Sequence, residues 1–313
     1  MATSSTYYLN APTLSQATSV FSDSALTTTA GDGYYRDGAV VRRLISGVLQ
    51  SEQQCGECYA QCGGLIKKSL PAGVYYMTIN SGSLPADTGA IVFEAILTDA
   101  PIGMLVQYNG ENFNEVISTA HGSLRSTNPN NPTFVGLTGD DCSISGSTFT
   151  LDVYNYVDGE FVATGTTETI LVSSGDVQLT ATSPMLMCII APKPSNLPNA
   201  VTIKVVVPCT RESANVDFYI NCPEDLESFE SSVKAATYDG ACELGKTQTF
   251  YRIDLNSTPG VLQLNDKVFI DKYGRTGLAE KYGAGYYYVR GMDESYDWFR
   301  IDSDSIIVEL GLC

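Results

Sequence analysis

The sequence predicts an all-β protein, and three observations carry this prediction. Apolar and polar residues alternate with a period of two over 91–97, 149–154 and 201–207, which places one set of side chains on the core face of a sheet. Turn dipeptides separate such segments, and segments with helical spacing are few. Short strands joined in this way are typical of an antiparallel β-sandwich, and we predict one of jelly-roll type.

The turn residues define the expected hairpins. The turn dipeptides are Asn109-Gly110, Ser145-Gly146, Asp158-Gly159 and Ser174-Gly175. The clearest hairpin is 154–162, where Asp158-Gly159 lies between two alternating runs. Apolar residues within 44–49 have helical spacing, but Gly47 interrupts them and a strand is expected there.

The expected elements divide the chain into four parts. We predict an N-terminal small β module at 1–62, a central β-sandwich at 63–222, a linker at 223–247 and a C-terminal small β module at 248–313 that is related to the first. Within the linker, Leu226, Phe229 and Val233 follow an acidic segment with helical spacing and predict a short helix.

Composition and charge disfavour several classes of function. The 313 residues include 18 Lys and Arg against 35 Asp and Glu, a formal net charge of −17. No nucleic-acid partner is expected, because phosphates require clustered Lys and Arg. No apolar run approaches the roughly 20 residues of a membrane helix, so no membrane partner is expected. Residues 1–5 show no signal-peptide pattern, so synthesis in a cytoplasm is expected.

The two ends of the chain contain the same succession of motifs. Both begin with an aromatic strand, continue through Val-Phe-x-Asp and Gly-Tyr-Tyr to a final apolar strand, and close on a cysteine. The first copy comprises 6–8, 20–23, 32–35, 44–49 and Cys55, and the second comprises 249–251, 268–271, 284–288, 299–310 and Cys313. A small β module used twice buries little surface alone, so each copy should pack on a neighbour.

The N-terminal copy carries a resemblance to known proteins. Its segment 7–27, Tyr-Tyr-Leu-Asn-Ala-Pro-Thr-Leu-Ser-Gln-Ala-Thr-Ser-Val-Phe-Ser-Asp-Ser-Ala-Leu-Thr, with Asp-Gly-Tyr-Tyr at 32–35, resembles short modules in virion structural proteins of tailed bacteriophages, chiefly marine cyanophages and phages of Bacteroidetes hosts. The resemblance covers 6–62 and 249–313. It implies a virion component of the tail, neck, baseplate, fibre or capsid surface, made in the host cytoplasm.

The resemblance also implies how such a protein acts. We expect a protein without enzymatic activity that assembles with itself, as a homo-oligomer, and with other virion proteins. The alternative is a carbohydrate-binding or host-receptor-binding adhesin module, for which jelly-roll sandwiches are common scaffolds and a glycan is the partner. A glycosidase or protease is the least favoured class.

Cys55, Cys58 and Cys62 form the most conspicuous cluster of candidate ligands. Three thiolates at this spacing could share a Zn²⁺ ion. A fourth ligand would come from Cys222, Cys242 or Cys313. The nine cysteines are an odd number, so they cannot all pair within the chain. We favour structural cysteines that are free or partly oxidised over a metal site, and a metal site over specific disulfides. No cofactor is otherwise expected.

Carboxylate pairs offer two further chemistries. The pairs are Asp140-Asp141, Asp158 with Glu160, and Asp302 with Asp304. They could bind Ca²⁺ or perform glycoside hydrolysis, but solvated loop charge is the favoured interpretation. The only histidine, His121, lies in a small polar segment without a nucleophile motif and is interpreted as a loop residue.

Tyrosine runs supply the candidate contact surfaces. Adjacent rings on a strand point to opposite faces, so the runs at 34–35, 75–76 and 286–288 cannot form continuous stacks for a sugar. Contact between subunits is the favoured use of these rings. The interface candidates are Tyr34, Tyr35, Tyr286, Tyr287 and Trp298.

Overall fold

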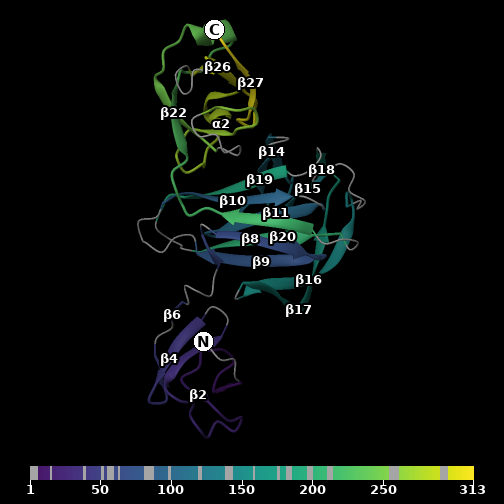
Figure 1. Ribbon diagram of the computed structural model, residues 1–313, viewed down its shortest axis with the longest axis vertical. Coiled ribbons are helices and arrows are strands. Elements are labelled where there is room, and N and C mark those ends of the chain that lie inside the picture. The colour runs from purple at the N-terminus through teal and green to yellow at the C-terminus, as the bar shows by residue number, and fades with distance from the viewer. Residues whose placement is uncertain are drawn as a thin grey trace. The chain divides into compact units, whose positions relative to one another are not determined.

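The computed structural model shows an almost entirely β-structured chain (Figure 1). It describes residues 6–14, 16–37, 40–50, 53–54, 60–62, 64–80, 88–97, 100–118, 122–137, 144–157, 159–174, 177–180, 185–195, 200–209, 214–253, 261–289 and 295–313. The chain forms two compact units, one of Met1–Ala60 with Val157–Glu160 and one of Gln61–Tyr156 with Phe161–Cys313. The second unit contains both the predicted sandwich and the predicted C-terminal module.

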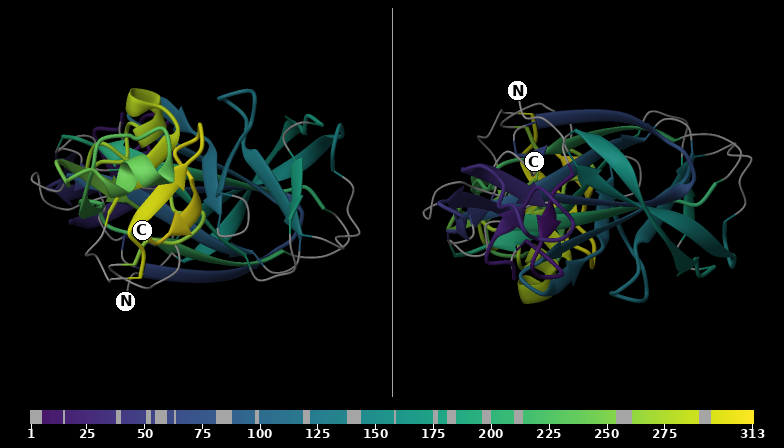
Figure 2. Two further views of the ribbon diagram at one scale, coloured as in Figure 1. Left: turned by 90° about the horizontal axis from the view of Figure 1, so that it is seen from above. Right: turned by 90° about the horizontal axis from the view of Figure 1, so that it is seen from below.

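Two large sheets form the sandwich (Figures 1 and 2). The strands of the first sheet follow the order β8 (Gly64–Leu70), β21 (Ala214–Ile220), β10 (Gly89–Leu97) and β19 (Met185–Lys193). The strands of the second sheet follow the order β9 (Gly73–Asn80), β20 (Ala200–Val207), β11 (Ile102–Tyr108) and β15 (Thr133–Leu137). Within each set, every neighbouring pair is antiparallel. Of these eight strands, the first, eighth, third and sixth form one sheet and the second, seventh, fourth and fifth the other. This is the jelly-roll order, so the predicted topology is confirmed.

Further strands extend both sheets at their edges. β13 (Glu115–Ser118) and β14 (Gly122–Arg125) continue the first sheet beyond β19, and β16 (Thr148–Val157) and β17 (Glu160–Leu171), teal in Figure 2, continue the second beyond β9. β12 (Glu111–Phe113) pairs with β11, and β18 (Val177–Thr180) pairs with β15. The predicted hairpin at 154–162 is therefore the tip of β16 and β17. The Asn109-Gly110 turn between β11 and β12 has φ of 52° and 79°, the positive values that a type I′ turn requires.

Strand β10 departs from simple alternation for a structural reason. Ile91, Phe93 and Ala95 are buried, as a period of two predicts, but Val92 on the opposite face is buried as well. Val92 belongs to an apolar cluster with residues of the C-terminal segment. The C-terminal module therefore covers the outer face of the first sheet, which a strand pattern alone cannot reveal.

The C-terminal module consists of two three-stranded sheets and two helices. One sheet contains β22 (Glu227–Ser231), β23 (Gln248–Arg252) and β24 (Val268–Phe269), and the other β25 (Gly285–Tyr288), β26 (Trp298–Ile301) and β27 (Ile307–Gly311). The helices α1 (Tyr238–Cys242) and α2 (Leu278–Tyr282) have five residues each. Aromatic and aliphatic side chains of both sheets form one core, which includes Phe229, Phe250, Tyr287 and Phe299.

The helix predicted around 226–233 is wrong. These residues contain strand β22, in which Phe229 pairs with Phe250 and is buried while its neighbours on either side are exposed. The edge of β23 offers backbone partners to this segment, and the Phe229 ring contacts those of Phe250 and Phe299. The helix of the predicted linker is α1, which begins after Thr237, whose hydroxyl accepts a hydrogen bond from the Gly240 N–H.

The N-terminal unit is a smaller version of the same design. Its strands are β1 (Tyr8–Leu9), β2 (Val20–Phe21), β3 (Gly33–Asp37), β4 (Val40–Ile45), β5 (Val48–Leu49) and β6 (Gln53–Gln54), and β7 (Ala60–Gln61) follows them. The predicted strand at 44–49 is a hairpin instead. Ser46 and Gly47 form its turn with φ of 51° and 80°, and Leu44 pairs with Leu49.

The two modules share their strand register. In the first, Tyr8 lies opposite Phe21, and in the second, Tyr251 lies opposite Phe269. The following sheets match as well. Gly33 pairs with Leu44 and Tyr34 with Arg43 in one, and Gly285 pairs with Ile301 and Tyr286 with Arg300 in the other. The motif order read from the sequence therefore corresponds to equal positions in two equivalent frameworks.

An aspartate organises the same loop in each module. Asp23 accepts hydrogen bonds from the backbone N–H groups of Ala25, Thr27 and Thr28. Asp271 accepts from residues at the same offsets, Tyr273, Arg275 and Thr276. The N–H of Thr27 is the main cause that lowers the pKa of Asp23, against the opposing effect of burial.

Core positions match in the same way. The hydroxyl of Tyr35 donates to the Gly31 carbonyl, and that of Tyr287 donates to the Gly283 carbonyl, four residues back in both cases. Corresponding apolar residues are Leu14 and Leu262, Val20 and Val268, Ala30 and Leu278, Leu44 and Ile301, and Leu49 and Ile307. The longer spacing in the second copy holds helix α2, which follows the Asp271 loop.

Replacing Asp271 with alanine should lower the free energy of unfolding by about 1–2 kcal/mol, because three loop N–H groups lose their acceptor. Denaturant unfolding followed by tryptophan fluorescence measures this loss at Trp298 in the same module. Asp304→Ala, which removes an exposed carboxylate, is the matched control and should change stability by less than about 0.5 kcal/mol. Equal losses in the two variants would contradict the role given to Asp271.

Candidate functional site

The C-terminal module binds the sandwich through a continuous apolar contact. The sandwich contributes strands β10, β13 and β19, and the module contributes Phe269 of β24 and residues next to β22, β23 and β27. The buried members are Ala90, Val92, Ile117, Cys188 and Ile190 from the sandwich, and Leu226, Ile253, Phe269 and Ile306 from the module. Tyr251 and Leu186 pack against this cluster and are partly buried. Apolar burial of this kind is the main favourable term in such a contact.

Two glycines allow the surfaces to approach closely. A Cβ atom at Gly274 would lie 2.8 Å from Cγ2 of Ile190, and one at Gly122 would lie 2.8 Å from Cγ2 of Ile306. Both glycines also have positive φ, of 71° and 70°. At these two positions, one on each side of the junction, a side chain would push the module away from the sheet.

A buried ion pair closes the edge of this contact. Lys267 precedes β24 and its side chain is 5% exposed. Its Nζ donates to Oε1 of Glu115 on β13. Glu115 also accepts from the Ser123 hydroxyl and, at 2.8 Å, from the largely exposed Arg125. Burial opposes ionisation of Glu115, but Lys267, Ser123 and Arg125 together outweigh it and hold the pKa of Glu115 below its usual value.

A groove of about 620 Å³ lies beside the ion pair. Residues on its sandwich side include Asn109, Asn112 and Phe113, and residues on its module side include Arg275 and Glu280. Asn112 is held on both ends, since its amide oxygen accepts from Gln107 at 3.1 Å and its amide nitrogen donates to Asn130 at 2.8 Å. Amide and charged groups next to an aromatic ring can hydrogen-bond and stack on a hydroxylated ligand.

The structure corrects two of the predicted interface residues. Tyr287 and Trp298 are buried inside the C-terminal module. The Tyr287 ring stacks on Phe299, and the Trp298 ring stacks on Tyr238 and meets Tyr286 edge-on. Tyr287 is a core residue because it packs between the two sheets, and Trp298 is one because Ala235 and Ala241, before and within α1, cover it.

The remaining interface candidates have mixed outcomes. Tyr286 is partly exposed, and the Arg300 guanidinium lies 5.9 Å from its ring centre. Tyr35 is half-buried and packs against the core of the first module. The Tyr34 side chain lies outside the described part of the structure.

The cysteine prediction needs a larger correction. Cys62 forms a disulfide with Cys222, across 160 residues of sequence, so its sulfur is not a thiolate and the assignment of Cys62 as a metal ligand is wrong. Cys55 and Cys58 lie outside the described residues. Within the described ranges, no group of three or more His, Cys, Asp or Glu side chains is placed to hold a metal ion.

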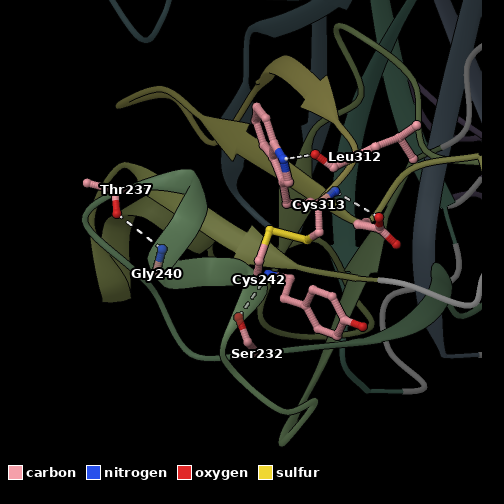
Figure 3. Close-up of a disulfide and its surroundings, with 9 residues drawn as sticks. Ser232, Thr237, Gly240, Cys242, Leu312 and Cys313 are labelled. Atoms are coloured by element: carbon pink, nitrogen blue, oxygen red, sulfur yellow. Dashed lines mark hydrogen bonds between the residues drawn. A yellow bond between two sulfur atoms is a disulfide. The ribbon is translucent and has the colours of Figure 1, made fainter.

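A second disulfide joins Cys242 of α1 to Cys313 (Figure 3). The segment before Cys313 is held further by hydrogen bonds, since the Trp298 indole donates to the Leu312 carbonyl at 3.2 Å and the Cys313 N–H donates to Asp297 at 2.8 Å. Cys209 is also disulfide-bonded, and Cys188 is the one free cysteine of the described chain. Specific disulfides, the interpretation we ranked last, are therefore what the described cysteines mostly form.

The carboxylate pairs are only partly described. Asp140, Asp141, Asp158 and His121 lie outside the described residues, and Glu160 is exposed. One oxygen of Asp302 accepts from the N–H groups of Asp304 and Ile306 at 2.9 and 3.0 Å. Asp302 therefore serves the turn between β26 and β27.

Glu115 and Lys267 were missed by the sequence interpretation. They are 152 residues apart, and neither lies in a motif, so only the fold brings them together. Lys267 directly precedes the Val-Phe-x-Asp motif, and this proximity is the one signal that the sequence offers.

Comparison with known proteins adds no relative. The chain matches no protein-family model, no curated protein and no solved structure. No helix in the described ranges is both long and apolar enough to span a membrane.

Replacing Glu115 with glutamine should lower the free energy of unfolding by about 2–4 kcal/mol, because it leaves the charge of Lys267 buried without its carboxylate. Arg125→Gln, which removes the exposed partner of the same carboxylate, is the control and should cost less than about 1 kcal/mol. Urea unfolding with the disulfides intact measures both values.

The same comparison depends on pH. The pKa of Glu115 is lowered, so its contribution is present above its usual value near 4.5 and is lost as the pH falls through the lower folded value. The stability difference between the wild type and Glu115→Gln should therefore shrink below pH 4.5. A difference that stays constant from pH 7 to pH 3, or equal losses in both variants, would contradict the proposed ion pair.

Proposed function

We propose that this protein is a non-enzymatic structural component of a tailed-phage virion that acts through contacts with copies of itself and with other virion proteins. The single observation that carries the proposal is the repeated module. One chain contains two copies of the same β framework, and the second copy binds the outer face of a β-sheet through one of its own faces. The module is thus an attachment unit, and a chain with two such units suits assembly.

Two further features support an assembly role. The jelly-roll sandwich is common in viral capsid and lectin domains, although a fold alone does not define a function. The net charge of −17 keeps copies soluble and apart before assembly, because like-charged surfaces repel. That the particle is a tailed phage is inferred from the resemblance of both modules, in sequence, to virion proteins of tailed phages.

Mass spectrometry of purified particles from the phage that encodes this chain should detect it at a fixed copy number per particle. A structural component co-purifies with infectious particles through density-gradient centrifugation and remains after a high-salt wash that removes loosely held host proteins. The ratio of its peptides to those of the major capsid protein should be constant across preparations. Its absence from washed particles, or a ratio that varies with each preparation, would exclude the virion role.

A second candidate, carbohydrate binding, is favoured by the groove alone. Asn109 and Asn112, the charged Arg275 and Glu280, and the ring of Phe113 line one cavity. Planar polar groups beside an aromatic ring suit the hydroxyl groups and the apolar face of a sugar. Such a site could coexist with the assembly role, since it lies on the sandwich and the C-terminal module.

A glycan array probed with the full chain tests this second candidate. Saturable binding that is lost on Asn112→Ala and Phe113→Ala would support it, because those variants remove a held amide and the aromatic surface of the groove. Tyr238→Ala, which removes an exposed ring that does not line the groove, is the matched control and should bind normally. An array without saturable binding would exclude the carbohydrate role of the groove.

A further inference from the structure

The two walls of the groove belong to the two partners of the module contact. Asn109 and Phe113 line it from the sandwich, and Arg275 lines it from the C-terminal module. The contact itself reaches the groove, because Ile190 and Phe269 of the apolar cluster line it as well. A ligand that fills the groove therefore touches both partners and covers the junction between them.

Both walls are held in place by bonds within the chain. On the sandwich side, the buried amide of Asn114 donates to the carbonyls of Asn128 and Asn131, at 3.0 Å each, and fixes the turn between those residues. On the module side, the carboxylate of Glu280 accepts from the Gly277 N–H at 3.3 Å. A groove with fixed walls loses little conformational freedom when a ligand binds, so more of the contact energy appears as affinity.

Two polar side chains of the groove are available to a ligand. Within the described residues, neither the Asn109 amide nor the Arg275 guanidinium forms a side-chain hydrogen bond or an ion pair. An amide offers donors and an acceptor, and a guanidinium offers five donors. The ring of Phe113, which is only partly buried, adds apolar surface. Together these groups fit a ligand that has many hydroxyl groups and one apolar face.

The charges that line the groove cancel. Its three carboxylates and three cations are those of Glu111, Glu115 and Glu280, and of Arg125, Lys267 and Arg275. In the whole chain, 35 acidic residues stand against 18 basic ones. An acidic ligand would be repelled by the chain and would meet no net positive charge in the groove, whereas a neutral ligand is not repelled. The balance of charge therefore favours a neutral ligand.

A peptide fits this groove less well than a sugar does. Peptides are recognised through pockets that accept their apolar side chains. The residues of the apolar junction that line the groove, Ile117, Ile190 and Phe269, are at most 9% exposed, so they offer no such pocket.

We propose that the groove binds a neutral oligosaccharide and that the bound sugar bridges the sandwich and the C-terminal module. Hydroxyl groups of the sugar pair with Asn109 and Asn112 on one wall and with Arg275 on the other, and its apolar face lies on Phe113. The complete site exists only when the module is docked, so a bound sugar adds its binding free energy to the docked arrangement. The proposal deepens the carbohydrate candidate given above and rests on it, because it names the class of sugar and the effect of binding.

An array that carries neutral glycans beside sialylated and uronic-acid glycans tests the ligand class. The full chain should bind neutral glycans saturably, and Arg275→Gln should weaken this binding at least about tenfold, because the module wall loses its guanidinium. The matched control is Arg300→Gln, the same change in the same module away from the groove, which should bind normally. Binding of acidic glycans alone, or equal binding by Arg275→Gln and the wild type, would overturn the proposal.

The thiol of Cys188 reports on the bridging. It is fully buried in the apolar contact between the two partners. Burial raises the pKa of this thiol well above its usual value, so the docked junction leaves it unreactive. With the disulfides intact, a thiol reagent at low concentration should label Cys188 only when the module lifts from the sheet. Mass spectrometry of the peptide that contains Cys188 measures the rate.

The sugar should slow this labelling. The neutral oligosaccharide with the strongest array signal, added to the wild type at about ten times its Kd, should lower the rate about tenfold, because it binds only the docked arrangement. The same concentration should leave the rate of Arg275→Gln nearly unchanged. A neutral sugar that binds the wild type without slowing the labelling of Cys188 would overturn the bridging.

These outcomes are separable from those of the functions proposed above. Loss of binding in Asn112→Ala and Phe113→Ala, together with normal binding in Arg275→Gln, would leave the carbohydrate candidate standing and overturn the bridging. An array without saturable binding of any glycan would overturn both. The virion role depends on neither result, because mass spectrometry of washed particles decides it.

Discussion

The packing of the C-terminal module on the outer face of the first sheet is the contact on which the architecture of the larger unit depends. It converts β10 from a strand with one buried face into one buried on both, so that Val92 is core as fully as Phe93. Apolar burial supplies most of the attraction but has no direction. The orientation of the module on the sheet is set by the close approach at Gly122 and Gly274 and by the Lys267–Glu115 pair.

The ion pair adds specificity more than affinity. Removing two charges from water costs about as much as their attraction returns, so a buried pair stabilises a contact little relative to apolar residues of the same shape. A misplaced module, however, would bury Lys267 away from Glu115, and that arrangement is strongly unfavourable. The disulfide between Cys62 and Cys222 acts on the same junction, because it ties the chain just before β8 to the chain just after β21, where the C-terminal segment begins.

Local pattern predicted much of the fold because the strands of a sandwich are defined by near neighbours. Alternation located β20 and turn chemistry located the hairpin tip at 154–162, while the order of motifs revealed the repeat. What failed depended on partners distant in sequence. Phe229 joins a strand because β23 lies beside it, Tyr287 is core because a second sheet covers it, and Cys62 finds Cys222 only in the folded chain. The groove and the ion pair of Glu115 could not be predicted for the same reason, since each combines residues of the sandwich with residues of the C-terminal module.

The two modules show which parts of their framework are fixed and which are free to change. Asp23 and Asp271 accept the same three backbone bonds, and Tyr35 and Tyr287 donate to the same carbonyl. Most other positions differ between the copies, and one face is among them, with Leu26 where the second copy has Gly274 and Ser19 where it has Lys267. The framework tolerates such changes because backbone hydrogen bonds to Asp23 or Asp271 hold each loop, and the side chains on this face take no part in those bonds. The N-terminal module therefore keeps apolar residues at Tyr8, Phe21 and Val48, while Ser19 and Ser24 stand where the C-terminal module has Lys267 and Lys272.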